Sequence, residues 1–311
     1  MLSYPVIILI AVVAFALIFD FINGFHDTAI SIATSISTRV MTPFVAIAMA
    51  AVLNFAGALW SHQVAKTISS GIVNSTLVPE YILIGTLLAA IIWDLVTWWF
   101  GIPSSSSHAL IGGLVGSAIA YAGSVNIIMW HGVWKKVVFP LFASPVAGFI
   151  LGWLLMKFLN WILQSFSLRF VNGVFSKLQI VSAAFMAFTH GMNDAQKSMG
   201  IITFAMIGAG FLPLNSNVPL WVMISCAFAI SAGTAVGGWR IIKTMGFGMY
   251  KMKPINGFAA QTAGAAVIAV ASHFGQPVST THVISSTILG VGAAKRLSAV
   301  RWGLARDIVW A

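Results

Sequence analysis

The amino-acid sequence predicts an all-α polytopic membrane protein with inverted-topology repeats, two broken helices and two re-entrant helical hairpins. Of its 311 residues, 59% are hydrophobic and only 7% are charged, whereas soluble domains carry about 25% charged residues. Several apolar runs reach about 18 residues, enough for a helix to cross the roughly 30 Å hydrocarbon core. The runs are continuous rather than alternating, which argues against a β-barrel. The composition therefore excludes a soluble enzyme.

The first half is predicted to contain a broken helix, a span and a hairpin. A broken helix over residues 5–38 is interrupted by the polar run Asn23–Asp27, and a span over 43–60 follows. Two apolar stretches within 81–121 are joined only by Gly101–Pro103, which is too short and too apolar for a solvated loop between two crossings. We therefore expect a re-entrant hairpin whose turn is buried in protein or lines a cavity.

The second half repeats this order. A second broken helix is expected over 178–209, interrupted at His190–Asp194, and a span over 219–239 comes next. A second hairpin is expected over 254–294, with Gly275–Pro277 at its turn. The polar motif and the hairpin turn thus occur in the same order in both halves of the sequence.

The two repeats are assigned to residues 1–136 and 178–294, with a linking span and a connection over 137–177. The number of crossings between the two repeat starts is odd, so the halves must have opposite orientation. This is the inverted-repeat plan of many secondary transporters, whose sites lie near the bilayer midplane. Residues 295–311 are expected to begin a last helix that is incomplete.

The basic residues predict the orientation, because cytoplasmic loops carry an excess of Lys and Arg. On this topology one side holds the N-terminus with Lys66, Lys135 and Lys136, and Lys197 lies within the membrane. The other side holds Arg39, Lys157, Arg169, Lys177, Arg240, Lys243, Lys251, Lys253, Lys295, Arg296, Arg301 and Arg306. The richer side is therefore cytoplasmic and the N-terminus is outside. This explains the net charge of +10 without a nucleic-acid partner.

The hairpin turns predict an anion site. Each begins a helix with Pro followed by hydroxyl residues, over Ser104–Ser107 and Ser279–Thr281. Hydroxyls and free backbone N–H groups at two helix N-termini bind an anion without a charge of their own. The alternative is that these residues only cap the helices or bond neighbouring helices.

Two acidic residues predict a cation site. Asp27 and Asp194 lie in the polar motifs, and an ionisable group at this depth is a functional candidate. Asn23 and Asn193 add neutral oxygens, which together suit a hard monovalent cation or a proton. An anion between two carboxylates is repelled unless cations or protons neutralise them. The pattern therefore predicts cation-coupled anion transport.

Other intramembrane polar residues leave alternatives open. Lys197 follows Asp194 by three residues and is in position to neutralise it as a structural ion pair. Asp20 and Asp94 have no repeat partner and are second-tier candidates for a proton relay. The histidines of the motifs and hairpins are not spaced like a metal site, so capping or supporting roles are expected for His26, His108, His190 and His282.

No motif indicates an enzyme. The sequence has no phosphate-binding loop of a nucleotide-driven pump, no nucleotide fingerprint and no nucleophile elbow. Cys226 is the only cysteine, so no intrachain disulfide or thiolate metal cluster is expected. No cofactor is expected beyond the coupling cation.

The stretches Phe19–Ala29 and Thr189–Lys197, with the two hairpin turns, closely resemble the inorganic phosphate transporter (Pit) family of bacterial and archaeal low-affinity phosphate permeases. The resemblance implies a homodimeric symporter of orthophosphate or a neutral metal-phosphate with H⁺ or Na⁺. It implies cation coupling at Asn23, Asp27 and Asp194, and phosphate binding at Ser105, Ser106, Ser107, Ser279, Thr280, Thr281, Asn193 and Gln196, with Thr28 as a further candidate. The chain departs from the family where Ile30-Ser31 replaces Asn-Ala, and it lacks a long central loop.

Two alternatives stay open for the transported species. A sulfate or other tetrahedral-oxyanion permease of the same fold is one, although acceptors such as Asp27, Asp194 and Asn193 favour phosphate, which still carries a proton to donate. The other is a passive anion channel, which needs no buried carboxylate pair.

Overall fold

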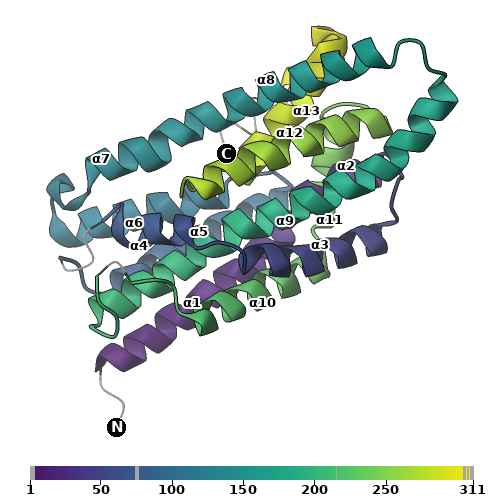
Figure 1. The fold of residues 1–311 in the computed structure, drawn as a ribbon. Helices are drawn as coiled ribbons and strands as arrows, with labels where there is room; N and C mark the ends of the chain where they lie inside the picture. The colour runs from purple at the N-terminus through teal and green to yellow at the C-terminus, as the bar shows by residue number, and fades with distance from the viewer. Residues whose placement is uncertain (1–3, 74–76, 215, 304–305, 307, 309–311) are drawn as a thin grey trace.

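The computed structural model describes residues 4–73, 77–214, 216–303, 306 and 308, and they form one bundle of helices (Figure 1). Five helices are long and apolar enough to cross a membrane, or up to seven if each of two bent helix pairs counts as one span. Within the described residues the sole β pairing is an isolated bridge between Val73 and Ile128. The predicted all-α polytopic fold is confirmed.

The first half begins with two helices separated by one residue, Asp27, whose N–H still donates to Asn23 O at 2.8 Å. The first predicted helix is thus interrupted at Asp27 alone, and Tyr4–Ser37 counts as one candidate span of 34 residues. The elements are α1 (Tyr4–His26), α2 (Thr28–Ser37), α3 (Pro43–Ala58), α4 (Gln63–Ser70), α5 (Ile82–Phe100) and α6 (Ser106–Ala122). Helix α4, which the sequence analysis did not predict, is bent 64° from α3.

A long link joins the halves. It consists of η1 (Val125–Ile127), α7 (Trp130–Val133), η2 (Trp134–Val138) and α8 (Phe139–Ile162). The stretch from α7 to α8 is a candidate membrane span of 33 residues, which begins earlier than the linking span predicted from residue 137.

The second half follows the order of the first. Its elements are α9 (Leu168–Gly208), α10 (Leu220–Val236), α11 (Trp239–Lys243), η3 (Thr244–Gly248), α12 (Pro254–His273), α13 (Thr280–Lys295) and η4 (Leu297–Ala299). The segment from α11 to η3 is bent 63° from α10, as α4 is from α3. Each half thus contains a bent pair followed by a hairpin. Of the last predicted element, 295–311, residues 304–305, 307 and 309–311 lie outside the described residues.

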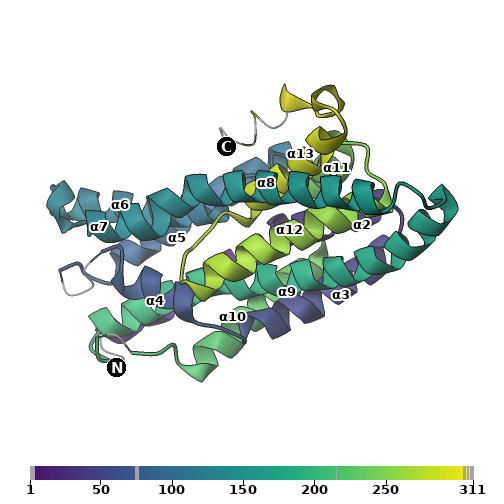
Figure 2. The same ribbon diagram turned by 45° about the horizontal axis from the view of Figure 1, so that its top comes forward.

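Three members of each of the two groups of basic residues predicted for opposite sides line separate cavities. Figure 2 shows α4 and α7 toward one end of the bundle and the connection from α8 to α9 at the other. Lys66, Lys135 and Lys136 line one cavity. A different cavity, beside the start of α9, is lined by Lys251, Lys253 and Lys295.

The interruption predicted at His190–Asp194 is wrong, because α9 is continuous from Leu168 to Gly208. Gly191 indicated a break in the helix, but its role is to let α9 pack closely against α3. A Cβ atom at this position would collide with the backbone of Asn54 in α3. The glycine therefore allows two helices to touch and leaves the hydrogen-bond ladder of α9 intact.

Glycines make equivalent contacts between the halves. In α1 and α10, Gly24 and Gly233 each face the backbone of the other helix, and Gly57 and Gly191 do the same in α3 and α9. Small residues let membrane helices approach closely. The first helix of each half, α1 or α9, thus packs against the first member of the other half's bent pair, α10 or α3, which interlocks the repeats.

Both hairpin turns use the same helix ending. Gly101 and Gly275 have φ angles of 69° and 66°, the left-handed conformation that glycine adopts most readily. The next residue donates its N–H back to the helix, from Ile102 to Thr97 O and from Gln276 to Ala271 O, both at 2.9 Å. This is the Schellman ending, and the following Pro prevents further helix. The predicted turn positions are confirmed.

Replacing Gly191 with alanine is expected to destabilise the protein by about 1–3 kcal/mol, because overpacking a close contact costs that much. Thermal unfolding in detergent, followed by tryptophan fluorescence, measures the change. Gly173→Ala on the same helix is the control, since a Cβ atom there meets nothing within 4 Å. Equal melting temperatures for the two variants would contradict the proposed role of Gly191.

Candidate functional site

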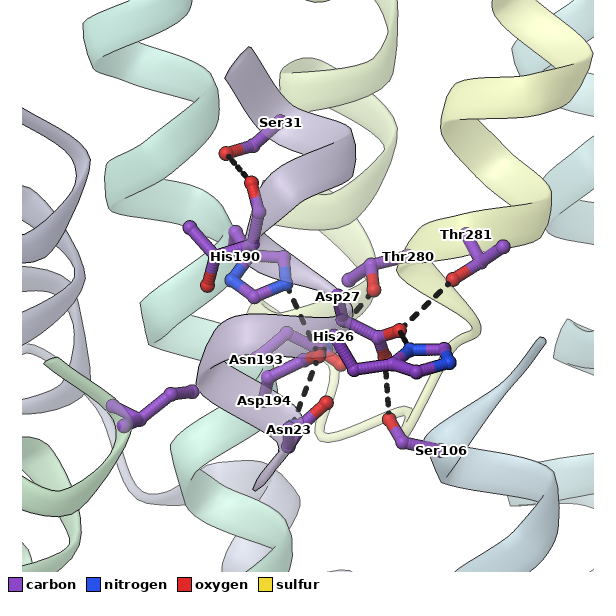
Figure 3. A network of polar contacts seen from close by, with 12 residues as sticks. Asn23, His26, Asp27, Ser31, Ser106, His190, Asn193, Asp194, Thr280 and Thr281 are labelled. Atoms are coloured by element: carbon purple, nitrogen blue, oxygen red, sulfur yellow. Dashed lines mark hydrogen bonds and ion pairs between the residues drawn. The ribbon is translucent and has the colours of Figure 1, made fainter. Parts of the chain in front are cut away.

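The predicted polar residues meet at the centre of the bundle (Figure 3). They come from the junction of α1 and α2, from the middle of α9, and from the first turns of α6 and α13. Both aspartates are fully buried, with Asp27 1% and Asp194 0% exposed. The site therefore combines both halves of the chain and both hairpins.

Asp27 accepts contacts from three elements. His26 Nδ1 lies 2.6 Å from Oδ1, and Ser106 Oγ donates to Oδ2 at 2.7 Å. Thr281 Oγ1, from the other hairpin, is 3.5 Å from Oδ1. The ring of His26 is positioned in turn by Thr97, whose Oγ1 lies 3.2 Å from Nε2. Both hairpins thus reach the same carboxylate.

Asp194 lies within a similar set of partners. Lys197 Nζ is 3.0 Å from Oδ1 and His190 Nε2 is 3.3 Å from Oδ2. Asn23 Nδ2 and Thr280 Oγ1 each donate to Oδ2 at 3.4 Å. This carboxylate therefore receives one contact from the other half and one from the second hairpin.

Lys197 connects the two aspartates. Besides its ion pair with Asp194, its ammonium donates to Ser106 Oγ at 3.1 Å, and Ser106 donates to Asp27. Lys197 is 1% exposed, so its charge is enclosed with those of the carboxylates. The ion pair considered from the sequence is present, and it belongs to the centre of the network.

Two amide oxygens of the site have no hydrogen-bond donor among the described residues: Asn23 Oδ1 and Asn193 Oδ1. The amide nitrogen of Asn193 donates to Ser272 Oγ at 2.8 Å and to Gln276 O at 3.4 Å. A buried acceptor without a donor costs about 1–3 kcal/mol. Neutral oxygens beside carboxylates are suitable ligands for a hard cation.

The six hairpin residues expected to bind phosphate fall into two groups. Ser106, Thr280 and Thr281 contact the aspartates. The other three have structural contacts: Ser105 Oγ and Ser279 Oγ accept from His108 N and His282 N, and Ser107 Oγ donates to Val278 O at 2.8 Å. The capping alternative thus describes Ser105 and Ser279, and Ser107 ties the two turns together.

Gln196 and Thr28 lie outside the ring of contacts around the aspartates. Gln196 Oε1 accepts from the backbone N–H groups of Val64 and Ala65, at 2.7 and 3.2 Å, so it caps the start of α4. Thr28 Oγ1 accepts from Asn54 Nδ2 at 3.1 Å. The amide nitrogen of Gln196, which is the group able to donate to phosphate, donates to Met192 O, so the predicted phosphate contact competes with that bond.

The second-tier acids are buried, but they lie apart from this ring. Ser198 Oγ donates to Asp20 Oδ1 at 2.7 Å. Asp20 Oδ2 and both oxygens of Asp94 have no hydrogen-bond partner among the described residues. Neither carboxylate is hydrogen-bonded to Asp27 or Asp194 within the described part of the chain.

Two of the histidines that were expected to cap or support lie directly against the aspartates. His26 and His190 contact Asp27 and Asp194 directly. The signal was local, because His190 precedes Asp194 by four residues on one helix face. No group of three or more His, Cys, Asp or Glu residues suited to a metal ion occurs among the described residues.

Comparisons with known proteins agree with this fold. Residues 23–311 match the model of the phosphate transporter family. A protein of Bacillus subtilis named "Probable low-affinity inorganic phosphate transporter" is 48% identical, over 97% of this chain and 91% of its own length. One of the same name from Rhizobium meliloti is 47% identical, over 99% and 91%. A solved structure described as "The sodium-dependent phosphate transporter" has a TM-score of 0.86 at 24% identity, covering 97% of this chain and 94% of its own.

Lys197→Gln is expected to destabilise the protein by about 3–5 kcal/mol, because it leaves the buried carboxylate of Asp194 without its cation. The double variant Asp194→Asn with Lys197→Gln removes both charges and should recover much of that loss. Thermal unfolding in detergent measures both. A double variant no more stable than Lys197→Gln alone would show that the ion pair does not explain the effect.

Proposed function

The chain belongs to the phosphate transporter family, whose members are multi-pass transporters rather than enzymes, and we propose that it imports inorganic phosphate by symport with Na⁺. The observation that carries this proposal is the meeting of both hairpin turns with Asp27 and Asp194 in one buried network. The homodimer implied by the family resemblance stays a prediction, which light scattering of the purified protein tests.

The anion position follows from the hairpins. Ser106 and Thr280 are the first residues of α6 and α13, so their hydroxyls lie at the positive ends of two helix dipoles. Free backbone N–H groups in those first turns suit phosphate oxygens. Phosphate binds there by taking over the hydroxyl donors that now serve the aspartates.

The cation requirement follows from charge. Phosphate beside two carboxylates is repelled by several kcal/mol at the low effective dielectric of the interior. Lys197 offsets one negative charge, so further positive charge is needed. Cations bound at Asp27 and Asp194 remove the repulsion, and cation and phosphate affinities are then reciprocally linked.

Two observations favour Na⁺ over H⁺ as the coupling ion. Asn23 Oδ1 and Asn193 Oδ1 are buried acceptors without a donor among the described residues. An amide oxygen coordinates a metal cation but does not hold a proton at neutral pH. The second is that the similar solved structure is named as a sodium-dependent phosphate transporter.

Uptake of labelled phosphate into proteoliposomes tests the function. An inward Na⁺ gradient should drive phosphate above its external concentration, and an imposed pH gradient alone should not. Excess sulfate should compete weakly, because it lacks the proton that phosphate donates to acceptors at the site.

Accumulation driven by the pH gradient alone would assign the coupling to H⁺. Uptake that ignores both gradients would indicate a channel. Adding and omitting Mg²⁺ separates free phosphate from a metal-phosphate.

Asp27→Asn and Asp194→Asn should each lower Na⁺-driven phosphate uptake by about tenfold or more, since each removes a charge that holds the cation. Phosphate binding, measured as a thermal shift, should persist and depend less on Na⁺. Glu80→Gln is the control, because this partly exposed acid lies outside the network. If both asparagine variants still concentrate phosphate, Asp20 and Asp94 become the coupling candidates.

The N-terminal side is proposed to face outward, on the basis of the basic residues. A cysteine at Asn126 should react with an impermeant thiol reagent added to intact cells, and one at Lys251 should react only after the cells are opened. Both positions are exposed and the native Cys226 is buried. The reverse labelling pattern would invert the proposed orientation.

A further inference from the structure

A cavity of about 760 Å³ lies at the end of the bundle that carries α4, α7 and η2. Its basic lining consists of Lys66, His131, Lys135 and Lys136. None of the described residues that line it is acidic. The three lysines are those predicted for the outer face. The cavity thus concentrates positive charge on the proposed uptake side, where such a cleft attracts anions.

The turn between α12 and α13 forms one wall of this cavity, through Phe274 and Gly275. Thr67 Oγ1 donates to Gly275 O at 2.6 Å, and Lys136 Nζ donates to Phe274 O at 3.0 Å. The next residue, Gln276, accepts from Asn193 in the candidate site. One turn of chain therefore separates the cavity from the buried site, and α4 and η2 hold that turn closed.

The other hairpin is closed in an equivalent way. Thr244 Oγ1 in η3 donates to Gly101 O at 2.9 Å, and the guanidinium of Arg240 donates to Trp99 O. Thr67 and Thr244 lie in the second members of the two bent helix pairs. Each hairpin turn is thus held by one threonine from a bent pair and by one cation. The cation is Arg240 of the second bent pair for one turn and Lys136 of η2 for the other.

The two cations differ in their freedom. Arg240 lies over the rings of Trp98 and Trp99, with its guanidinium carbon 5.0 and 4.7 Å from their centroids. Lys136 lines the basic cavity beside Lys66 and Lys135. An ammonium forms stronger hydrogen bonds with an anion than with a neutral carbonyl. An anion in the cavity therefore competes with Phe274 O for Lys136.

We propose that this cavity captures a phosphate-class oxyanion, and that the anion draws Lys136 from Phe274 O and so releases the α12–α13 turn toward the cavity. This rests on the proposed function, since it describes how phosphate reaches that site. The turn is then held by one bond instead of two, the one from Thr67 to Gly275 O. The turn of the α5–α6 hairpin does not respond in this way, because Arg240 is fixed on tryptophan rings.

Cysteine accessibility in reconstituted protein tests the proposal. A cysteine at Gln276, which is partly exposed beside the turn, is treated with an impermeant thiol reagent, with and without inorganic phosphate and in the absence of Na⁺. Phosphate should raise the labelling rate several-fold. Lys136→Gln should raise the basal rate on the order of tenfold, as expected for a lost charge-assisted hydrogen bond, and abolish the effect of phosphate.

Two further variants separate anion binding in the cavity from the hydrogen bonds that hold the turn. Thr67→Val should raise the basal rate and keep the phosphate effect. Thr67 also lines the cavity, but its hydroxyl proton is donated to Gly275 O, so the change loosens the turn and leaves the lysines that attract the anion in place. Lys251→Gln with Lys253→Gln, on the other basic cavity, should change nothing. The proposal is overturned if phosphate does not change the labelling rate of the protein that retains Lys136. It is also overturned by a phosphate response that survives in Lys136→Gln.

Vesicle composition separates free phosphate from a lipid headgroup, since both present the same oxyanion. The experiment is run in vesicles of zwitterionic lipid alone and with added anionic phospholipid. Faster labelling caused by anionic lipid alone would assign the cavity to a headgroup and overturn its role in capture. The readout needs no cation gradient. Failed gradient-driven uptake with an intact phosphate response would therefore contradict the proposed function and leave this inference standing.

Discussion

The fold depends on the need to stabilise two carboxylates buried in a membrane protein. An ionised carboxylate in such surroundings costs several kcal/mol unless donors and cations compensate it. Neither repeat supplies all of these alone, because Asp194 receives Asn23 from the first half and Asp27 receives Thr281 from the second. The halves must therefore interlock, and the close helix crossings that glycine permits bring them near enough to do so.

The same exchange between halves holds the two hairpin turns in place. The turn of the α5–α6 hairpin is bonded by Thr244 of the second half, and that of the α12–α13 hairpin by Thr67 of the first. Ser107 joins the two turns through Val278 O. An inverted repeat places these equivalent contacts toward opposite faces, so losing one need not break the other.

The sequence was informative where the signal is local. Apolar runs predicted the spans, Gly followed by Pro predicted both hairpin turns, and the repeated motifs predicted Asp27 and Asp194 at the centre. Helix α4 was missed because it has eight residues with several polar side chains, and its first turn is capped by Gln196, more than 130 residues away. The break in α9 was predicted wrongly because glycine indicates both helix ends and close packing. Which applies at Gly191 depends on α3, and the local sequence does not contain that contact.

Under the proposed symport, the contacts in the site explain how two ligands of opposite charge would become linked. A hydroxyl group has one proton to donate. Ser106 donates its proton to Asp27, and Thr280 donates its proton to Asp194. Neither hydroxyl can donate to phosphate until its aspartate is satisfied in another way, and a cation at the carboxylate does this. The cation therefore lowers the negative charge and also frees the donor that phosphate needs. Each ligand thus stabilises the arrangement that the other requires, and the linkage lies in the hydroxyl protons as well as in the charges.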